Sequence, residues 1–500
     1  MKTAISPTRS ENYPQWYQEV IIAADLAQVA SVRGCMIINP WGYAIWEKIQ
    51  RILDDEIKAR GHENIYCPLL IPLSHIEREA EHIEGFAKEC AVVTHSKLQK
   101  AENGKLEPAS ELEEPLVIRP TSEMVIGDVF AQRIQSHRDL PVLMNQWANI
   151  MRWEMRTRMF LRTSEFLWQE GHTAHTTEDE AHSHALHMLA CYKTFCEDKL
   201  GLPVITGKKS KNERFPGAVE TYTLEGIMQD NKALQLGTSH YLGQNFAKSC
   251  NIQYQDAAEK RQYVHTSSWG VTTRLIGGLV MTHADDDGLV CPPKIAPTQI
   301  VLIPIIRKEE DKEAIIAYCK AIQSMLQEKV YDDGRLRVHI DIKDRKPSEK
   351  KWHWVKKGVP IRCEIGMNEV TGRNVSYALR IDTNHKREVN SLDDFNNNVI
   401  EYLSETQEKL YQSAKNKLSP KHCPLITNKD TLFKHFSTES PTPALIYWHD
   451  DDKIEKDLQE QFKVSIRCYP EEDIFNYEER GKSLFDSTKV GQLALIAKAY

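Results

Sequence analysis

The sequence of 500 residues predicts an α+β protein that is too long for a single ordinary domain. Three observations lead to this prediction. Two strand-like segments adjoin between residues 149 and 175, three prolines at 292, 293 and 297 mark a domain break, and strands and helices alternate after it. We expect an antiparallel sheet flanked by helices, then a mixed α/β domain, then a small α/β domain, over residues 1–292, 293–404 and 405–500.

The composition excludes several classes of protein. With 41% hydrophobic and 27% charged residues, the chain is typical of soluble globular proteins. It has no run of about 18 apolar residues, so no membrane span is expected, and its first residues, MKTAISPTRSENY, lack the apolar segment of a secretory signal. Eleven cysteines without a CxxC pair indicate reduced thiols, which favours a cytoplasmic location.

The first elements follow from apolar periodicity. Residues 19–30 predict a helix, and the apolar positions from Ala44 to Ile57 recur with helical period until Gly61 ends that second helix. Residues 64–72, NIYCPLLIP, predict a strand. Its Pro68 cannot donate to a sheet, which favours an edge or an oligomer interface. The charged stretch from 96 to 114 predicts a surface loop.

The next segment, PLVIRPTSEMVIGDVFAQRI, predicts a strand up to Arg119, a turn at Pro120 and a helix. Thr121 and Glu123 bracket the start of this helix. Locally they are well explained as an N-cap and an acidic residue that the helix dipole favours.

A hairpin is predicted around residues 149–175. Arg152 and Glu154 are two residues apart, which directs both side chains to one face of a strand. Glu170 and His172, near the end of the next strand, would add to that face. The hairpin is either an ordinary surface pair with cross-strand ion pairs or a polyanion site.

The remaining elements of the first domain are a helix at 178–200, the segment QLGTSHYLGQNFAK at 235–248, and a strand, Arg274 and an apolar helix within 267–293. A glycine pair at 277–278 allows another chain segment to approach this last helix closely.

The α/β domain contains a basic segment. After the strand at 300–305 we expect a helix (311–329), a strand (337–342), a basic helix, a strand (361–366), a turn into residues 374–381, and a helix near 392–418. The segment from Lys343 to Arg362 contains eight Lys or Arg residues and only two acidic ones. Trp352, His353 and Trp354 lie among them. This pattern suits RNA, although a solvated helix with core tryptophans is the alternative.

Several motifs together carry a resemblance that each alone would not. The chain resembles prolyl-tRNA synthetases of the archaeal/eukaryotic-like type, which are class II aminoacyl-tRNA synthetases. The resemblance covers nearly all 500 residues, and its motifs are RGCMIINPWGYAIWE, IRPTSE, RWE with FLRTSEFLWQEGHTAH, QLGTSH, SWGVTTRLIGG, GVPIRCEIG and the final AKAY. It implies a class II catalytic domain followed by an anticodon-binding domain and a C-terminal domain.

The resemblance implies an ATP site in which Arg152 and Arg274 are the catalytic pair. Arg152 would bridge the α-phosphate and the amino-acid carboxylate, Arg274 would face the γ-phosphate or adenine, and Phe166 would stack under adenine. The implied ATP-binding residues are Arg152, Glu154, Arg162, Thr163, Phe166, Gln235, Thr238, Thr272 and Arg274. ATP would arrive with Mg²⁺.

The same resemblance implies the proline-binding residues: Thr121, Glu123, Arg152, Trp168, Glu170, His172, His240 and Ser268. A carboxylate and a hydroxyl can satisfy the two N–H donors of a secondary ammonium together. We expect alanine to be activated as well, since an apolar pocket distinguishes a ligand from a smaller one by only about 1–3 kcal/mol per methylene. Only about ninety residues separate His175 from His265, too few for the large editing domain of bacterial-type relatives, so no editing in cis is expected.

No metal site is expected. His184 and His187 are spaced i,i+3 on a helix, which more often marks a solvated face than a ligand pair. Family members commonly hold zinc in the C-terminal domain with four cysteines. Here Cys423 and Cys468 remain, but Ser483 and Asp486 stand where a cysteine pair is expected, so no structural zinc should bind.

The resemblance also implies partners. These are tRNA(Pro), L-proline, ATP and a second copy of the chain, with no membrane involved. Motif 1, which is the helix from Ala44 to Ile57 and the strand bearing Pro68, would form the homodimer interface. Candidate anticodon contacts are Lys350, Lys356, Arg362 and Arg373.

Three functions fit the sequence. The first is ligation of proline to tRNA; the second is an adenylating paralogue that does not charge tRNA; the third is a non-catalytic RNA-binding or regulatory protein on a synthetase scaffold. The presence of Arg152, Arg274, Thr121 and Glu123 argues against the third, and the basic segment argues against the second.

Overall fold

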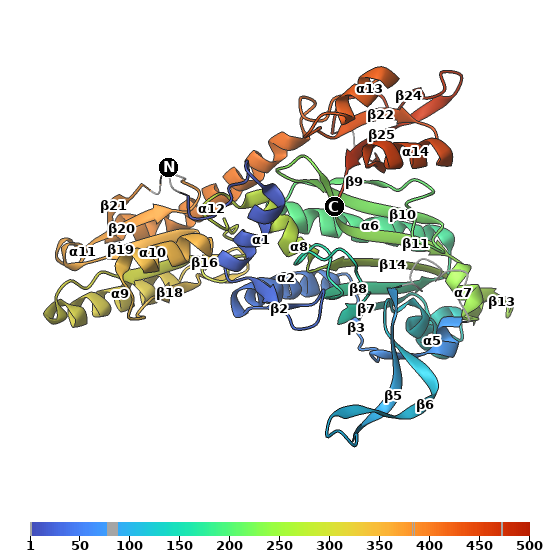
Figure 1. The fold of residues 1–500 in the computed structure, drawn as a ribbon, viewed down its shortest axis with the longest axis horizontal. Coiled ribbons are helices and arrows are strands. Elements are labelled where there is room, and N and C mark those ends of the chain that lie inside the picture. The colour runs from blue at the N-terminus through green and yellow to red at the C-terminus, as the bar shows by residue number, and fades with distance from the viewer. Residues whose placement is uncertain (1–2, 78–88, 383, 385, 472–473) are drawn as a thin grey trace.

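A computed structural model of the chain describes residues 3–77, 89–382, 384, 386–471 and 474–500. Figure 1 shows a central catalytic part, an α/β domain at one end joined by the long helix α12 (Leu392–Lys415), and a C-terminal domain above the central sheet. The mixed architecture confirms the predicted α+β class. None of the described helices is both long enough and apolar enough to cross a membrane.

The catalytic part is built on a large sheet whose strand order is β22-β25-β23-β9-β10-β11-β14-β8-β7-β3. Its first three strands, β22 (Ala444–Trp448), β25 (Val490–Lys498) and β23 (Val464–Pro470), come from the C-terminal domain. The helices of the catalytic part are α1 (Tyr13–Ala23), α2 (Pro40–Ala59), α3 (Leu73–Glu77), α5 (Glu123–Arg133), α6 (Glu178–Asp198), α7 (Asn245–Ser249) and α8 (Arg274–His283). Its strands are β1 (Ala27–Val29), β2 (Met36–Ile38), β3 (Glu63–Asn64), β4 (Leu70–Pro72), β5 (Ala91–Lys100), β6 (Leu106–Ile118), β7 (Val142–Met151), β8 (Glu165–His175), β9 (Ile205–Lys208), β10 (Glu220–Ile227), β11 (Ala233–Gly243), β12 (Gln253–Gln255), β13 (Arg261–Tyr263) and β14 (His265–Thr272).

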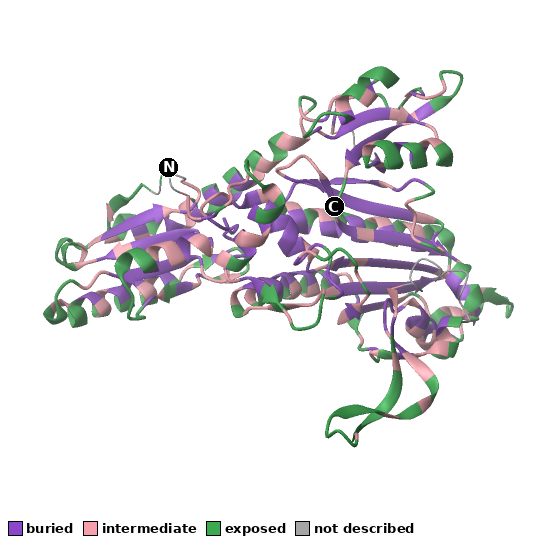
Figure 2. Cartoon of the chain, viewed as in Figure 1, coloured by how far each residue is buried: buried purple, intermediate pink, exposed green. Residues whose placement is uncertain are grey.

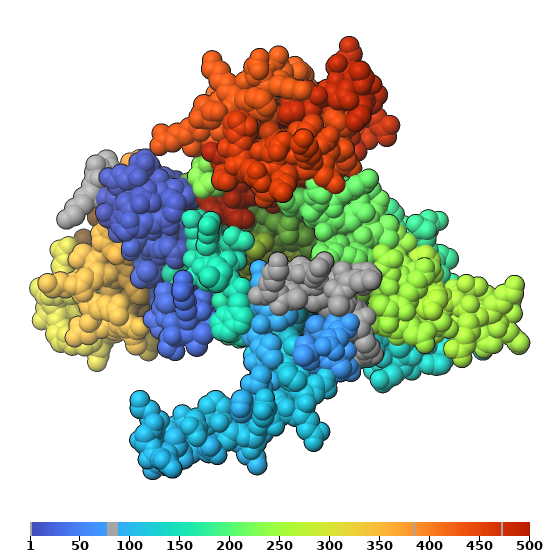
Figure 3. Space-filling model, turned by 45° about the vertical axis from the view of Figure 1, so that its right-hand side comes forward, coloured from blue at the N-terminus to red at the C-terminus, as the bar shows by residue number. Residues whose placement is uncertain are grey.

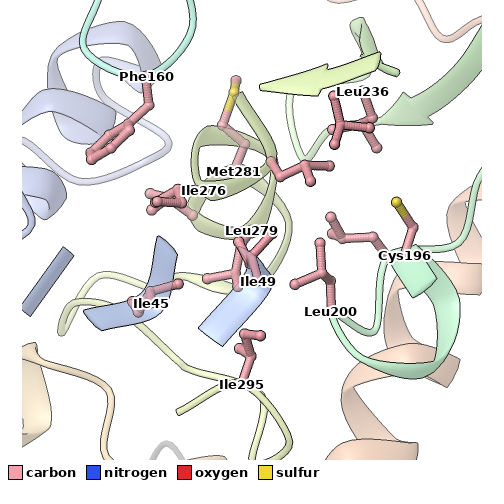
Figure 4. Close-up of a cluster of buried hydrophobic side chains, with 14 of the residues drawn as sticks. Ile45, Ile49, Phe160, Cys196, Leu200, Leu236, Ile276, Leu279, Met281 and Ile295 are labelled. Atoms are coloured by element: carbon pink, nitrogen blue, oxygen red, sulfur yellow. The ribbon is translucent and has the colours of Figure 1, made fainter. Parts of the chain in front are cut away.

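Helix α8 lies at the centre of the catalytic core. Figure 4 shows Ile276 and Leu279 of α8 between Ile45 and Ile49 of α2 on one side and Leu200 and Leu236 on the other. The glycine pair at 277–278 packs against side chains rather than backbone. A Cβ on Gly277 would lie 2.6 Å from Leu161 Cδ2, and one on Gly278 would lie 2.6 Å from Leu236 Cδ2. Both neighbours belong to the segments that form the pocket described below.

Three predictions for the first domain are wrong in detail. The helix expected at 19–30 ends at Ala23, because Asp25 has a left-handed φ of +58°, and β1 follows. The strand expected at 64–72 divides into β3 and β4, which belong to different sheets, so Pro68 lies in the connection between them. The expected loop at 96–114 is instead the hairpin of β5 and β6.

This hairpin is an arm that projects from the body of the molecule (Figures 1 and 3). Most of its residues are exposed, and Leu98 and Leu106 are 67% and 69% exposed. Because both faces of the arm meet solvent, its sequence lacks the alternation of apolar and polar residues by which a half-buried strand is recognised.

The α/β domain has the five-stranded sheet order β18-β15-β19-β20-β21, parallel across the first three strands and antiparallel across the rest. Helix α11 stands where a turn was expected after residue 366, and the other expected elements are present. The bounds are β15 (Ile300–Pro304), α9 (Lys312–Gln327), β16 (Val330–Tyr331), β17 (Gly334–Arg335), β18 (Val338–Ile340), α10 (Pro347–Lys356), β19 (Ile361–Ile365), α11 (Met367–Gly372), β20 (Asn374–Leu379) and β21 (Glu388–Ser391).

The C-terminal domain extends the catalytic sheet, because β23 pairs antiparallel with β9 through Tyr469–Lys208 and Pro470–Gly207. Its elements are α13 (Lys429–Phe436), β22 (Ala444–Trp448), α14 (Asp452–Phe462), β23 (Val464–Pro470), β24 (Arg480–Lys482) and β25 (Val490–Lys498). The boundary expected at residue 404 falls inside α12, which continues to Lys415.

Candidate active site

A pocket of about 460 Å³ lies on one face of the catalytic sheet. Arg152 and Arg274, which belong to different elements, both line it. The other residues expected to bind proline or ATP line the same pocket: Thr121, Glu123, Glu154, Arg162, Thr163, Phe166, Trp168, Glu170, His172, Gln235, Thr238, His240, Ser268 and Thr272. The structure therefore brings the whole predicted set together.

Strand register explains why residues from distant motifs meet. His172 on β8 is paired with Ser268 on β14, Ser268 with His240 on β11, and His240 with Thr221 on β10. Side chains of directly paired residues point to the same face of a sheet. These four residues therefore form one row across four strands.

Further rows follow at steps of two residues. Glu170 is paired with Gly270, and Gly270 with Thr238, while Trp168 is paired with Thr272. Gly270 has no side chain to fill the floor between Glu170 and Thr238, and a Cβ there would lie 2.9 Å from the Gln169 carbonyl oxygen. The rows run from the residues expected to bind proline towards those expected to bind ATP.

The hairpin differs from the prediction at its turn. Arg152 and Glu154 lie just beyond β7, which ends at Met151, so they belong to the loop rather than to the strand. The Arg152 N–H still donates to the Ser164 carbonyl oxygen at 2.8 Å, which keeps the start of the loop attached to the returning chain.

A buried carboxylate–imidazole pair stands at one end of the pocket. Glu170 Oε1 accepts hydrogen bonds from Ser122 Oγ at 2.5 Å and Gln146 Nε2 at 2.7 Å, while its Oε2 lies 3.0 Å from His172 Nε2. Burial alone would lower the pKa of His172, but the hydrogen bond and charge of Glu170, with the charge of Glu123, outweigh burial and raise that pKa. Glu170 therefore favours the protonated form of His172 more than an open, unpaired site would.

Glu123 is a second, half-buried acid beside this pair. Burial, as the largest cause, raises its pKa, although the nearby His172 charge acts to lower it. Thr121 Oγ1 donates to the Glu123 carboxylate. The local explanation of Thr121 as a helix cap is wrong, because the N-cap of α5 is Ser122, whose side chain makes no capping hydrogen bond.

His240 is held neutral in the pocket. Its Nδ1 lies 3.0 Å from Thr221 Oγ1, and that hydroxyl also accepts a hydrogen bond from the Phe215 N–H at 3.0 Å. Burial, with the charge of His172, lowers the pKa of His240 to about 3.

Arg152 is fixed from two sides. Its Nε donates to the Pro120 carbonyl oxygen at 2.9 Å, and its guanidinium carbon lies 5.9 Å from the ring centroids of both Phe166 and Trp168. Burial lowers its pKa, although the surrounding carboxylates act to raise it. A half-buried guanidinium held in this way is prepared to bind an anion.

Arg274 begins helix α8 and points across to the loop and to β11. Its Nε donates to the Leu161 carbonyl oxygen at 3.2 Å and one terminal nitrogen donates to the Gln235 carbonyl oxygen at 3.3 Å. Burial, then the charges of Arg162 and Arg152, lower its pKa to about 10. Clustered cations that disfavour one another create a strong positive potential, which an anionic ligand would relieve.

Four residues that line the pocket have a buried polar atom without a hydrogen-bond partner among the described residues: Trp168 Nε1, Arg214 Nε, Ser268 Oγ and Trp269 Nε1. Such groups are rare in folded proteins, and a bound ligand is one of their ordinary explanations. Glu154, by contrast, is engaged with the exposed Arg162 at 3.3 Å, across the mouth of the hairpin loop.

The sequence did not single out one wall of the pocket. Glu89 belongs to it, and so does the loop between β9 and β10, through Lys209, Arg214 and Phe215. The signal was present, since KKSKNERF combines basic residues with an aromatic one as the anticodon candidate did. It lacks a recognisable motif, however, and only the fold places it beside Arg152.

Comparison with known proteins decides the family. The tRNA synthetase class II core domain (G, H, P, S and T) matches residues 105–283, and the anticodon binding domain matches residues 299–402. A proline–tRNA ligase of Bdellovibrio bacteriovorus is 49% identical over 100% of this chain and 99% of its own length. Proline–tRNA ligase 2 of Anaeromyxobacter dehalogenans is 48% identical over the same shares.

The chain belongs to the prolyl-tRNA synthetases. The crystal structure of prolyl-tRNA synthetase from Cryptosporidium parvum complexed with halofuginone and AMPPNP superposes with a TM-score of 0.88 at 34% identity, covering 99% of this chain and 97% of that one. A second structure of that enzyme, complexed with L-proline and AMP, matches with the same TM-score at 33% identity. The chain is thus a class II aminoacyl-tRNA synthetase, as its motifs implied.

Within this prolyl-tRNA synthetase, the anticodon candidates divide by exposure. Lys350 is buried and its Nζ donates to the Asp341 carbonyl oxygen at 2.8 Å, and Arg362 is buried beside Glu364. Neither side chain is available to RNA in this arrangement, because each is a structural part of the domain. Lys356 is half-buried and Arg373 is exposed.

The alternative of core tryptophans is correct for Trp354. Its Nε1 donates to Asp341 Oδ2 at 2.8 Å, and its ring packs edge-on against Trp41 of α2, with centroids 5.9 Å apart. The Lys357 ammonium lies 5.0 Å from the Trp41 ring and 3.1 Å from Asp25 Oδ2. Part of the basic segment therefore attaches this domain to the catalytic part.

The described residues contain no group of three or more His, Cys, Asp or Glu side chains arranged to hold a metal ion. Cys423 and Cys468 lie in one apolar cluster, and burial raises the pKa of both thiols. Ser483 Oγ is 2.5 Å from His449 Nδ1.

His184 Nε2 is 3.1 Å from His62 Nε2. Because His62 Nδ1 donates to the Ile57 carbonyl oxygen, His184 is the donor between the two rings.

Proposed function

We propose that this pocket activates L-proline with ATP and that the chain then transfers the prolyl group to the 3′ end of tRNA(Pro). The observation that carries the proposal is the convergence of Arg152 and Arg274 on one pocket whose other end holds Glu123. The relatives are proline–tRNA ligases, and the neighbouring enzyme was solved with L-proline and AMP and with an ATP analogue.

Activation is the attack of a carboxylate on the α-phosphorus of ATP, with pyrophosphate leaving. The carboxylate of proline is ionised at pH 7, so no side chain need act as a general base. Two anions must approach, and Arg152 neutralises both because its planar guanidinium can contact the carboxylate and the α-phosphate together. Arg274 stabilises negative charge on the phosphates, and positioning supplies the remaining acceleration.

The other end of the pocket suits the ammonium of proline. Glu170 is engaged by His172 at 3.0 Å, which leaves the Glu123 carboxylate to balance the ligand's positive charge. The Thr121 hydroxyl can satisfy the second N–H of the secondary amine. Trp168 and Ser268 have donors to spare, and Trp168 also provides an apolar face for the pyrrolidine ring.

Magnesium fits this pocket only as a companion of ATP. The described residues include no three-ligand acidic or histidine cage, and Mg²⁺ is usually held by substrate phosphates, water and one or two carboxylates. Of the carboxylates near the cations, Glu154 is placed to serve. When bound, the ion would neutralise phosphate charge.

Further features of the proposal rest on the family likeness and on exposure. Exposed basic side chains at 343–346 and Arg373, rather than Lys350 and Arg362, would contact the anticodon stem-loop. A homodimer would cover exposed apolar side chains near motif 1, among them Val29, Ile37 and Tyr43. We also propose a cytoplasmic enzyme without editing in cis; rapid hydrolysis of Ala-tRNA by the purified chain would contradict the last point.

The test is ATP–pyrophosphate exchange with proline, with alanine and cysteine as controls, followed by transfer to tRNA(Pro). Proline-dependent exchange without transfer would indicate an adenylating paralogue, and absence of both would indicate a non-catalytic protein. Zinc content of the purified chain tests the expectation of a metal-free C-terminal domain.

A further inference from the structure

The wall of the pocket formed by residues 209–217, here called the 209–217 loop, is held from outside the catalytic domain. Lys209, Glu213, Arg214, Phe215 and Pro216 line the pocket. The loop leaves β9, whose last residues pair with β23 of the C-terminal domain. In the sheet β23 lies between β9 and β25, and Figure 1 shows α14 of that domain close to β9.

The first attachment is a buried carboxylate of the C-terminal domain. Glu455 on α14 is 6% exposed, and it accepts hydrogen bonds from Ser210 Oγ at 3.2 Å and Asn212 Nδ2 at 3.0 Å. A buried acid needs such partners, because an unpaired carboxylate would be strongly destabilising. Glu455 does not line the pocket, so its two bonds act on the loop alone.

The second attachment is a buried ion triad. Glu225 on β10 is fully buried and accepts from Lys209 Nζ at 3.1 Å. Arg467 of β23 clamps the same carboxylate, with one terminal nitrogen 3.0 Å from Oε2 and 3.2 Å from Oε1. The charges of Arg467 and Lys209 outweigh burial and hold the pKa of Glu225 below its ordinary value. Arg467 thus fixes the carboxylate that fixes Lys209.

The loop in turn touches the row of residues expected to bind proline. The Phe215 ring lies 4.7 Å from that of His240, and the Phe215 N–H donates to Thr221, whose hydroxyl is hydrogen-bonded to His240 Nδ1. A displaced loop would therefore change both the shape of the amino-acid end and the hydrogen bonds that hold His240.

We propose that Glu455 and Arg467 of the C-terminal domain are positioning residues for amino-acid activation, acting through the 209–217 loop. This inference rests on the proposed function, because its readout is the use of proline. The C-terminal domain then completes the catalytic pocket, in addition to any role of its own.

The experiment compares single variants in ATP–pyrophosphate exchange and measures KM for proline, KM for ATP and kcat. Glu455→Met removes both acceptor oxygens at a similar side-chain length, and Asn212→Ala removes one bond from the loop side without disturbing a buried charge. We expect KM for proline to rise about 5–10-fold and 2–5-fold, respectively, with kcat and KM for ATP changed less than about twofold, since the first variant loses both hydrogen bonds to the loop and the second loses one. The matched control is Glu460→Met, which replaces an exposed acid on the same helix and should match the wild type.

A second pair tests the triad. Arg467→Met should raise KM for proline, and Arg467→Lys should restore most of the affinity because it returns the charge. Should the Arg467 variants fail to fold, Glu455→Met and Asn212→Ala decide the matter. Folded variants with wild-type KM for proline, whatever their melting temperature, would overturn the proposal. An inactive wild-type chain would instead refute the proposed function.

Discussion

Gly270 offers a sharp test of the row arrangement on the pocket floor. In Gly270→Ala, the new Cβ would lie 2.9 Å from the Gln169 carbonyl oxygen, a backbone atom that can yield only if β8 moves by a few tenths of an ångström. Such a shift would displace Glu170, which is directly paired with Gly270. Overpacking of this kind costs about 1–3 kcal/mol of stability.

The catalytic effect should exceed the structural one. Displacements of about 1 Å in positioning groups cost about 100-fold in rate, so a smaller shift predicts a loss of about 10-fold or more in kcat/KM for proline-dependent exchange. Gly334→Ala is the matched control, since a Cβ there meets nothing within 4 Å, and it should stay within about twofold of wild type. Wild-type exchange and melting temperature in Gly270→Ala would refute the register of β8 against β14 and the rows built on it.

Three further predictions concern charge. Arg274→Met should lower kcat for exchange about 100–1,000-fold, and Arg274→Lys should recover only part because an ammonium lacks the planar fork; a loss below threefold in single-turnover activation would argue against a phosphate contact. KM for proline should fall as pH rises through the raised pKa of Glu123, since the ionised form is needed, and Glu123→Gln should bind proline weakly at every pH; an unaltered pH profile would contradict this role. His184, whose pKa burial and neighbouring histidines lower to about 3, should destabilise the fold in acid. Because the unfolded chain takes up protons below about pH 6.5 and the folded His184 does not, the free energy of unfolding should fall on acidification by up to about 1.4 kcal/mol per pH unit. Urea titrations at several pH values should show that this free energy depends less on pH in His184→Gln than in the wild type.

Much of the site was predictable because its residues belong to short motifs with fixed spacing. The period of two along β8 and β14 was readable from Glu170 and His172, and the helix after Arg274 from its apolar run. How the strands order themselves was not readable from periodicity. Ser268 lies between His172 and His240 because β14 pairs with both β8 and β11 in a particular register. His172 and Ser268 are about a hundred residues apart in sequence, so no local pattern indicates this pairing.

The differences between the expected and the observed structure have one physical cause. Contacts with residues far away in the sequence override what the local sequence pattern indicates. Lys350 and Arg362 were expected to contact RNA because their neighbours in the sequence are basic. In the fold, Asp341 and Glu364 provide partners that allow both side chains to be buried. The β5–β6 arm read as a loop because neither of its faces is fully apolar. The 209–217 loop had no signature, because its position depends on Glu455, far away in the chain.

The junction of β9 with β23 has a consequence for how the protein assembles. These strands lie about 260 residues apart in sequence, and β25, which follows both in the chain, must insert between β22 and β23. Contacts so distant form slowly, because chain entropy must be lost before they contribute stability. Until they form, β9 is a bare sheet edge that can recruit strands from other molecules. Dilute, slow refolding should therefore recover active enzyme where rapid concentration yields aggregates.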